Sequence, residues 1–154
     1  MLSGTLISPD RVLTAAHCVV GGNVPRGARI GATDLTYGQI VQIICAVIHP
    51  FYYSDANGDL FNDVAVLKLA ERAETTSIIL NRDTVYPVAF GEKLIVIGFG
   101  NTSPDLGASA SPVLKELEIG VSVIFGQVVI PFLFICFLAS YHTNKAVFLS
   151  SFQS

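Results

Sequence analysis

The chain has 154 residues, a formal net charge of −3 and an apolar fraction of 51%. That length is enough for one domain with a hydrophobic core of its own. The small negative charge offers no basic surface for a phosphate backbone, so nucleic-acid-binding proteins are excluded from the functions considered.

Charged residues stop abruptly near position 119. Twenty of the 21 charged side chains lie between Asp10 and Glu118, and only Lys145 follows them. We therefore expect two compositionally different parts, a mixed polar part up to residue 118 and an apolar part after it.

Short β-strands separated by turns are predicted for the first 118 residues. The segments that alternate or are rich in strand formers are 4–8, 11–14, 39–48, 64–69, 93–97 and 113–121. Turn formers interrupt them at Pro9-Asp10, at residues 21–23 and 25–27, and in the polar loop 55–59. For residues 70–80 a short helix is an alternative to the surface loop that we expect. Many short strands without a sustained 3.6-residue period predict an all-β sandwich or barrel.

An uncharged run from Ile119 to Ala139 follows, in which Ser122 and Gln127 are the only polar side chains. About 20 mostly apolar residues in a helix cross the roughly 30 Å hydrocarbon core of a bilayer, so the run has the length of a membrane span. Pro131 would kink such a helix, but membrane helices tolerate proline better than soluble ones do. We expect a transmembrane helix over 119–139 and a polar tail over 140–154. The alternative is one or two buried strands, because the run is rich in valine.

Three cysteines, Cys18, Cys45 and Cys136, make an odd number. In a secreted protein an odd cysteine indicates a free thiol, an intermolecular disulfide or a missing partner. The spacing of cysteines and histidines does not match a zinc site, so we expect neither a metal nor another cofactor. No basic region followed by an apolar run comes after Met1, so no signal peptide is recognisable. We expect either that the chain is not exported by that route or that its true amino terminus lies upstream.

Two stretches carry residue types suited to catalysis. Thr14-Ala15-Ala16-His17-Cys18 follows a predicted strand, and Asn62-Asp63 precedes another, with 46 positions between His17 and Asp63. A serine hydroxyl is a poor nucleophile near neutral pH and needs an adjacent base, for which histidine suits because its ordinary pKa is about 6.5. An aspartate can hold the imidazole in the useful tautomer and stabilise the imidazolium.

These stretches resemble the trypsin-like serine proteases, peptidase family S1. The resemblance covers residues 1 to about 118. It includes the whole segment 4–18, the run Ile48-His49-Pro50-Phe51-Tyr52, and Gly98-Phe99-Gly100, which is similar to the family's Gly-Trp-Gly. It implies two β-barrels, of which this chain holds most of the first, without its first strand, and the start of the second.

For function, the resemblance implies that His17 is the general base and Asp63 its orienting partner, acting on a protein or peptide substrate outside the cell. A structural histidine and an ordinary turn aspartate are the alternatives. The order and spacing of the two strings favour the catalytic roles. His49, before Pro50, is expected to be a loop residue, and nothing converges on His142 in the tail.

Several family features are absent from these residues. The nucleophile's Gly-Asp-Ser-Gly-Gly string does not occur, and Ser150, Ser151 and Ser154 lack flanking glycines. The apolar run stands where the family has its specificity pocket, and the Ile-Val-Gly-Gly-like mature end is missing. Leu2 stands where the family places the cysteine that bridges to Cys18, so we expect Cys18 to lack its usual partner.

Three hypotheses follow. The leading one is a truncated trypsin-like protease homologue that does not hydrolyse peptides as written. The second is a non-catalytic binding module that engages another protein through its surface loops, and a membrane span over 119–139 would display it at a surface. The third is a fragment of an active secreted protease, with a tail read from non-coding or frame-shifted sequence.

Overall fold

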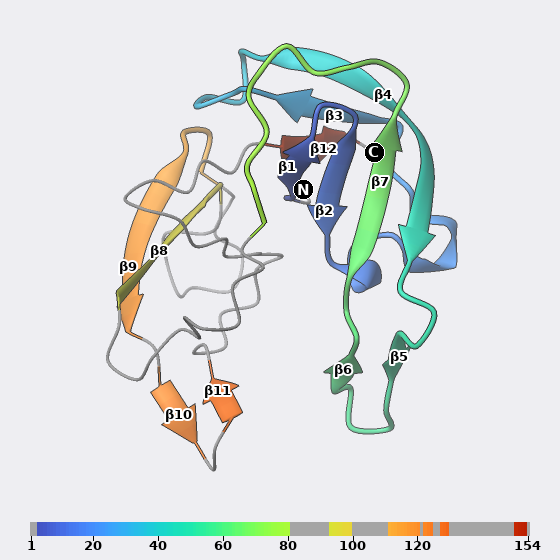
Figure 1. Ribbon diagram of the computed structural model, residues 1–154, viewed down its shortest axis with the longest axis vertical. Coiled ribbons are helices and arrows are strands. Elements are labelled where there is room, and N and C mark those ends of the chain that lie inside the picture. The colour runs from blue at the N-terminus through green and yellow to red at the C-terminus, as the bar shows by residue number, and fades with distance from the viewer. Residues whose placement is uncertain are drawn as a thin grey trace.

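The structure, a computed structural model, describes residues 3–80, 93–99, 111–120, 122–124, 127–129 and 150–153. Within these ranges the regular elements are β-strands and two short 3₁₀ helices (Figure 1). The strands are β1 (Thr5–Ser8), β2 (Arg11–Thr14), β3 (Gly27–Ile30), β4 (Gln39–Ile48), β5 (Tyr53–Ser54), β6 (Leu60–Phe61), β7 (Ala65–Leu69), β8 (Lys93–Gly98), β9 (Lys115–Gly120), β10 (Ser122–Ile124), β11 (Gln127–Val129) and β12 (Ser150–Gln153). The 3₁₀ helices are η1 (Ala16–Cys18) and η2 (Val20–Gly22). The prediction of an all-β fold is confirmed.

Six strands form one antiparallel sheet in the order β1-β2-β7-β4-β3-β12. The long strand β4 belongs to two halves of this sheet, because its first residues pair with β3 and its last residues pair with β7. The register shifts between Ile43 and Cys45, where one half gives way to the other. Such a bulge bends and twists a strand, and Figure 1 shows β4 curving across the top of the sheet and then down beside β7.

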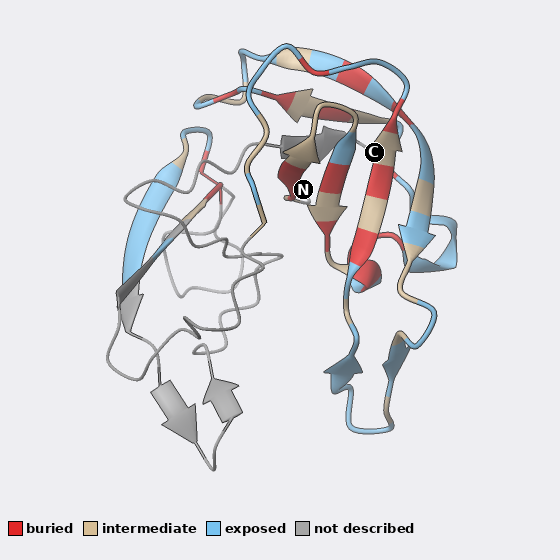
Figure 2. Ribbon diagram, viewed as in Figure 1, coloured by how far each residue is buried: buried red, intermediate tan, exposed pale blue. Residues whose placement is uncertain are grey.

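Alternation along β2 and β7 places one face of the sheet in the core. Val12 of β2 and Leu67 and Leu69 of β7 are almost completely buried (Figure 2). The residues that alternate with them, Leu13 of β2 and Val66 and Lys68 of β7, are partly exposed. Burying one such aliphatic side chain stabilises the fold by about 1.5–3 kcal/mol. The paired strands β2 and β7 are therefore a firm base for the segments that follow β2 and precede β7.

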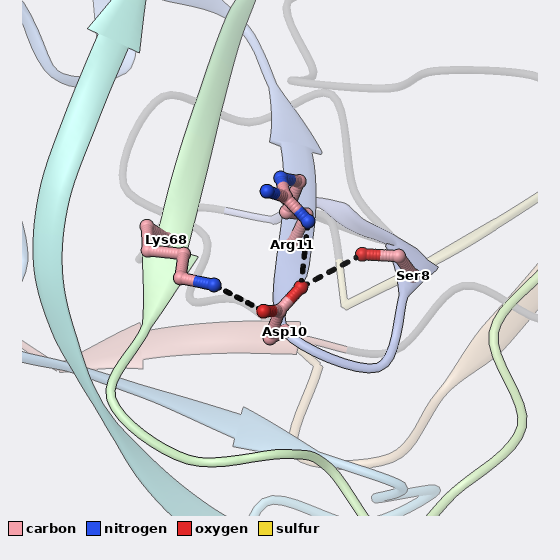
Figure 3. Close-up of polar contacts among 4 residues, drawn as sticks. All are labelled: Ser8, Asp10, Arg11 and Lys68. Carbon is pink, nitrogen blue, oxygen red and sulfur yellow. Dashed lines mark hydrogen bonds and ion pairs between the residues drawn. The ribbon is translucent and has the colours of Figure 1, made fainter.

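The turn between β1 and β2 is tied to β7 through Asp10 (Figure 3). Its carboxylate accepts hydrogen bonds from Ser8 Oγ at 3.1 Å and Arg11 Nη1 at 2.9 Å, and forms an ion pair with Lys68 Nζ. The hydrogen bond from Lys68 is the largest influence on Asp10 and lowers its pKa, against a smaller opposing effect of desolvation. This contact helps to fix the position of β7 relative to β2.

Strands β8 and β9 form a separate antiparallel pair at the position expected for the start of the second barrel. They lie close to the strands predicted for 93–97 and 113–121. The segment just before β9 is joined to the segment after β3 by backbone hydrogen bonds from Leu35 N to Pro112 O at 3.0 Å and from Leu114 N to Thr33 O at 2.8 Å. Phe99, which stands at the family's tryptophan position, is buried. These contacts agree with a partial trypsin-like barrel arrangement.

The sequence patterns do not predict β3, β5 or β6. Strand β3 begins at Gly27, inside a segment assigned to a loop, and β5 and β6 have two residues each around the loop 55–59. Strands β5 and β6 contain too few residues to display an alternating pattern, and pairing with each other defines them. Strand β3 is not predicted because the turn formers Pro25 and Gly27 stand at its start. Residues 70–80 form no helix, as expected.

The apolar run does not form the expected helix where the structure describes it. Strand β9 extends through Gly120, and β10 pairs with β11 as an antiparallel hairpin, with Ser122 opposite Val129. The predicted helical span over 119–139 is therefore wrong for these residues, because their valines and isoleucines adopt the extended backbone that β-branched side chains favour. Residues 130–149 lie outside the described ranges. Within those ranges, no helix is both long enough and apolar enough to span a membrane.

The end of the predicted polar tail is a strand. Strand β12 pairs with β3 in antiparallel register, with Ser150 opposite Ile30 and Gln153 opposite Gly27. It is the sixth strand of the sheet, at the edge next to β3, so at least this part of the tail belongs to the same sheet as β1–β4 and β7.

Candidate functional site

His17 lies on η1, immediately after β2. Its neighbours Ala16 and Cys18 are buried in the core, whereas the His17 side chain is 41% exposed. Thr14, the last residue of β2, is also buried and donates a hydrogen bond from its hydroxyl to the Ser3 carbonyl at 2.9 Å. The apolar anchors on both sides of His17 hold η1 against the sheet and leave the imidazole at the surface.

Asp63 lies between β6 and β7. The segment that separates it from His17 contains η2, β3, β4, β5 and β6. Figure 1 shows the hairpin β5–β6 extending away from the sheet and returning into β7. Because β2 and β7 pair in antiparallel register, with Thr14 opposite Ala65, the segment after β2 and the segment before β7 meet at one edge. This pairing brings together two residues that are 46 positions apart.

Both oxygens of the Asp63 carboxylate contact His17. Oδ1 accepts a hydrogen bond from the His17 backbone N–H at 2.8 Å, and Oδ2 lies 2.6 Å from imidazole Nδ1. An ionised carboxylate has no proton to give, so Nδ1 must carry the hydrogen of the second contact. In the neutral ring this tautomer leaves the lone pair on Nε2, the nitrogen that a general base uses. The Asp63 side chain is 22% exposed, so the pair is partly shielded from water.

Cys18 brings a sulfur atom close to the imidazole. Its Sγ lies 3.5 Å from His17 Nε2. Cys18 is disulfide-bonded. The cysteine that usually bridges to it in the family is absent, as expected, because Leu2 stands at that position, so this disulfide is not the family's usual bridge. A disulfide requires just two cysteines whose Cα atoms come within about 7 Å, wherever they lie in the chain. Cys45, on β4, is an exposed free thiol.

The other residues singled out from the sequence lie elsewhere. His49 follows β4, and its Nδ1 accepts a hydrogen bond from Phe51 N at 3.3 Å, in agreement with a loop role. Ser150 and Ser151 lie within strand β12, opposite Ile30 and Arg29. Ser154, Cys136 and His142 are outside the described residues. Among those that are described, no cluster of three or more His, Cys, Asp and Glu residues could hold a metal ion.

An aromatic stack marks the hairpin that leads into Asp63. The rings of Tyr53 on β5 and Phe61 on β6 are nearly parallel, at 5°, with centroids 4.5 Å apart. Both residues are exposed, as are Phe51 and Leu60 beside them. No pattern in the sequence indicates this apolar surface, since it depends on the pairing of two strands of two residues each.

Comparison with known proteins identifies relatives of this arrangement. The family model described as Trypsin matches residues 2–123. Trypsin theta of Drosophila erecta is 37% identical over 101 residues, which are 64% of this chain and 37% of that protein. Granzyme B of Rattus norvegicus is 35% identical over 77% of this chain and 47% of its own length. The solved structure titled "Structure of GrC" superimposes with a TM-score of 0.66 at 28% identity, over 78% of this chain and 52% of that one. The chain thus spans less than half the length of these two curated relatives.

Proposed function

This chain belongs to the trypsin family of serine proteases, and we propose that its His17 and Asp63 are the acid–base half of a peptide-hydrolysing site. The observation that carries the proposal is the two-point contact, in which Asp63 binds both the backbone N–H and Nδ1 of one histidine. The hydrogen bond to the backbone N–H alone would be enough to stabilise a turn. The second contact, to imidazole Nδ1, also orients the ring.

In the proposed mechanism, Asp63 holds the imidazole in the tautomer with hydrogen on Nδ1. Nε2 then accepts the proton of a serine hydroxyl as that oxygen attacks the peptide carbonyl. The carboxylate stabilises the positive charge that develops on the ring, and the imidazolium later returns the proton to the leaving amine. The proposed substrate is accordingly a protein or a peptide.

We further propose that residues 1–154 alone do not hydrolyse peptides. The nucleophile of this family stands in a Gly-Asp-Ser-Gly-Gly string, which these residues do not contain. The oxyanion of the tetrahedral intermediate needs preorganised backbone N–H donors, and losing one such donor already costs about 10²–10³ in kcat. Ser150 and Ser151 are placed in a strand that pairs with β3, a setting that differs from a glycine-flanked turn.

Purified chain incubated with a panel of peptide esters and a serine-directed phosphonate tests this proposal. We expect neither turnover nor labelling. The His17→Ala variant, measured in parallel, distinguishes genuine turnover from contamination. Turnover that disappears in His17→Ala, or a phosphonate adduct on any serine, would show that the chain is an active protease.

A second candidate function, a binding module, is favoured by the aromatic surface of the β5–β6 hairpin. Phe51, Tyr53, Leu60 and Phe61 are exposed there in a short stretch of chain. Exposed apolar patches of this kind are common at protein–protein interfaces. A purified partner that binds the chain stoichiometrically, and no longer binds a Tyr53→Ser, Phe61→Ser variant, would support this function over catalysis.

An extracellular location is part of the proposal. The disulfide at Cys18 supports it, because disulfides form and persist mainly in oxidising compartments. A membrane anchor over 119–139 is not proposed, since β9, β10 and β11 include residues from the first half of that run. The predicted boundary between residues 118 and 119 falls inside β9. The organisation into residues 1–118, 119–139 and 140–154 stays a prediction.

A further inference from the structure

Asn62, the residue before Asp63, adopts a backbone conformation that most side chains avoid. Its φ is 51°, and among the described residues no other non-glycine residue has a positive φ. The left-handed region is accessible to asparagine at modest cost, but it is strongly disfavoured for bulky and β-branched residues. Strain of this kind is maintained only where surrounding contacts hold it, and it is concentrated at functional sites.

Two hydrogen bonds hold Asn62 in this conformation. Its side-chain Nδ2 donates to the Phe51 carbonyl at 2.9 Å, which ties it to the turn after β4. Its own carbonyl accepts from Val64 N at 2.7 Å, a bond that spans three residues with Asp63 in the middle. Three-residue turns of this type are common at strand ends, and this one lies immediately before β7 and fixes the backbone at Asp63.

The residue after Asp63 is attached to the same turn. His49 N donates to the Val64 carbonyl at 2.9 Å, and Tyr52 N donates to the His49 carbonyl at 3.0 Å. Asp63 is therefore held on both sides by residues that hydrogen-bond to the segment 49–52. The backbone on either side of the Asp63 carboxylate is thus fixed by the hydrogen bonds of Asn62 and Val64 to the segment 49–52.

We propose that Asn62 is a positioning residue, whose left-handed backbone and amide hydrogen bond to Phe51 aim the Asp63 carboxylate at His17. This inference rests on the proposed function of the His17–Asp63 pair. Asn62 itself does not touch His17 in any described contact, so its effect must pass through Asp63.

Three substitutions separate the two parts of this role. Asn62→Gly keeps the positive φ but removes the amide donor. Asn62→Asp also tolerates the left-handed region but places a carboxylate, which cannot donate, against the Phe51 carbonyl. Asn62→Val introduces a β-branched side chain, for which the positive φ at this position is strongly disfavoured. Asn57→Gly, in the exposed loop of the same hairpin, is the matched control.

Proton NMR of the full chain reads the geometry directly, through the Nδ1 proton of His17 and the His17 backbone amide. In the unmodified chain we expect a strongly downfield Nδ1 proton that Asp63→Asn abolishes. We expect Asn62→Gly and Asn62→Asp to exchange this proton roughly fivefold to tenfold faster, as for loss of one hydrogen bond, and Asn62→Val to lose the signal. Asn57→Gly should leave it unchanged, and core amides such as that of Leu67 report whether each variant is folded.

The outcomes distinguish this inference from the function on which it rests. A signal that Asp63→Asn abolishes, but that is the same in all three Asn62 variants, overturns the positioning role and leaves the pair intact. If the unmodified chain has no downfield Nδ1 proton, both the pair and the positioning role fail. If Asn62→Val does not fold, the glycine and aspartate variants decide, and unchanged exchange in both rejects the proposal.

Discussion

Asp63 bridges two donors of a single residue, accepting the His17 backbone N–H at 2.8 Å and contacting imidazole Nδ1 at 2.6 Å. The backbone bond places the carboxylate relative to the chain, and the side-chain contact orients the ring. Because η1 and the segment before β7 are both attached to the β2–β7 pair, the geometry depends on the sheet as well as on the two residues.

Replacing Asp63 by asparagine should reverse the tautomer of His17. An amide nitrogen donates where the carboxylate accepted, so the neutral ring will present a lone pair at Nδ1 and carry its hydrogen on Nε2. Nitrogen-15 shifts of the imidazole measure this change, and Asp59→Asn in the neighbouring loop is the control. In the trypsin-type mechanism the same change lowers kcat by about 10⁴, because the wrong tautomer cannot act as a base. An unchanged tautomer would contradict the proposed orienting role.

Stability should fall in acid partly because of Asp10. Its pKa in the folded chain is lowered below the usual 3.8, chiefly by the Lys68 hydrogen bond, so the ionised form is favoured by folding. The resulting stabilisation is present above that usual value and is lost as pH falls through the lower folded pKa. Urea unfolding at near-neutral pH and at progressively lower pH should show a smaller acid-induced loss in Asp10→Asn than in the unmodified chain.

Asp34 supplies the comparison for this titration. Its pKa is also lowered, first by the hydrogen bond from the Thr36 side chain, but its partners are local and neutral. Asp34→Asn should therefore leave the contact between Asp10 and Lys68 unaffected. Identical acid dependence in Asp10→Asn and the unmodified chain would show that the Asp10 cluster contributes nothing.

Truncating Leu67 should destabilise the fold and disturb the site together. Leu67 is completely buried at the centre of β7, and Leu→Ala changes in cores cost about 2–5 kcal/mol. Leu60→Ala, at a position that is 42% exposed, should change the unfolding free energy by less than about 1 kcal/mol. Denaturant titration followed by circular dichroism measures both variants. Similar losses in the two would mean that β7 is not the core strand described here.

Removal of Ser150–Gln153 should expose the edge of β3. Strand β12 pairs with β3 along this edge, and an uncovered strand offers N–H and C=O groups to other chains. We expect the shortened chain to self-associate, with a concentration-dependent mass in light scattering coupled to gel filtration. A chain that lacks residues 150–153 and stays at the mass of the full chain would argue against a sheet-completing role for β12.

Prediction from sequence succeeds where the pattern is long enough to be read locally. Strands β2, β4 and β7 are found where alternation or β-branched runs indicate them, since each residue's side is set by its position in the strand. The motif resemblance, rather than periodicity, pairs His17 with Asp63, and the antiparallel register of β2 and β7 supplies the physical reason for their contact. Their catalytic roles stay predictions.

Prediction is less successful where one stretch of sequence suits two structures, or where a contact is remote in sequence. The apolar run has the composition of a membrane helix, but where it is described its β-branched residues form strands, of which β10 and β11 pair with each other and β9 pairs with β8. The disulfide of Cys18 is a contact that no local motif indicates.

The sequence by itself determined the trypsin lineage and the all-β class, and it predicted His17 and Asp63 as the residues of the site. The tertiary structure alone decided that Asn62 takes a left-handed backbone, that the turn 49–52 holds Asp63 from both sides, and that β12 joins β3. The physical reason is the range of the interactions. Side-chain alternation and turn propensity operate between adjacent residues, whereas the direction of a carboxylate depends on hydrogen bonds between segments that only folding brings together.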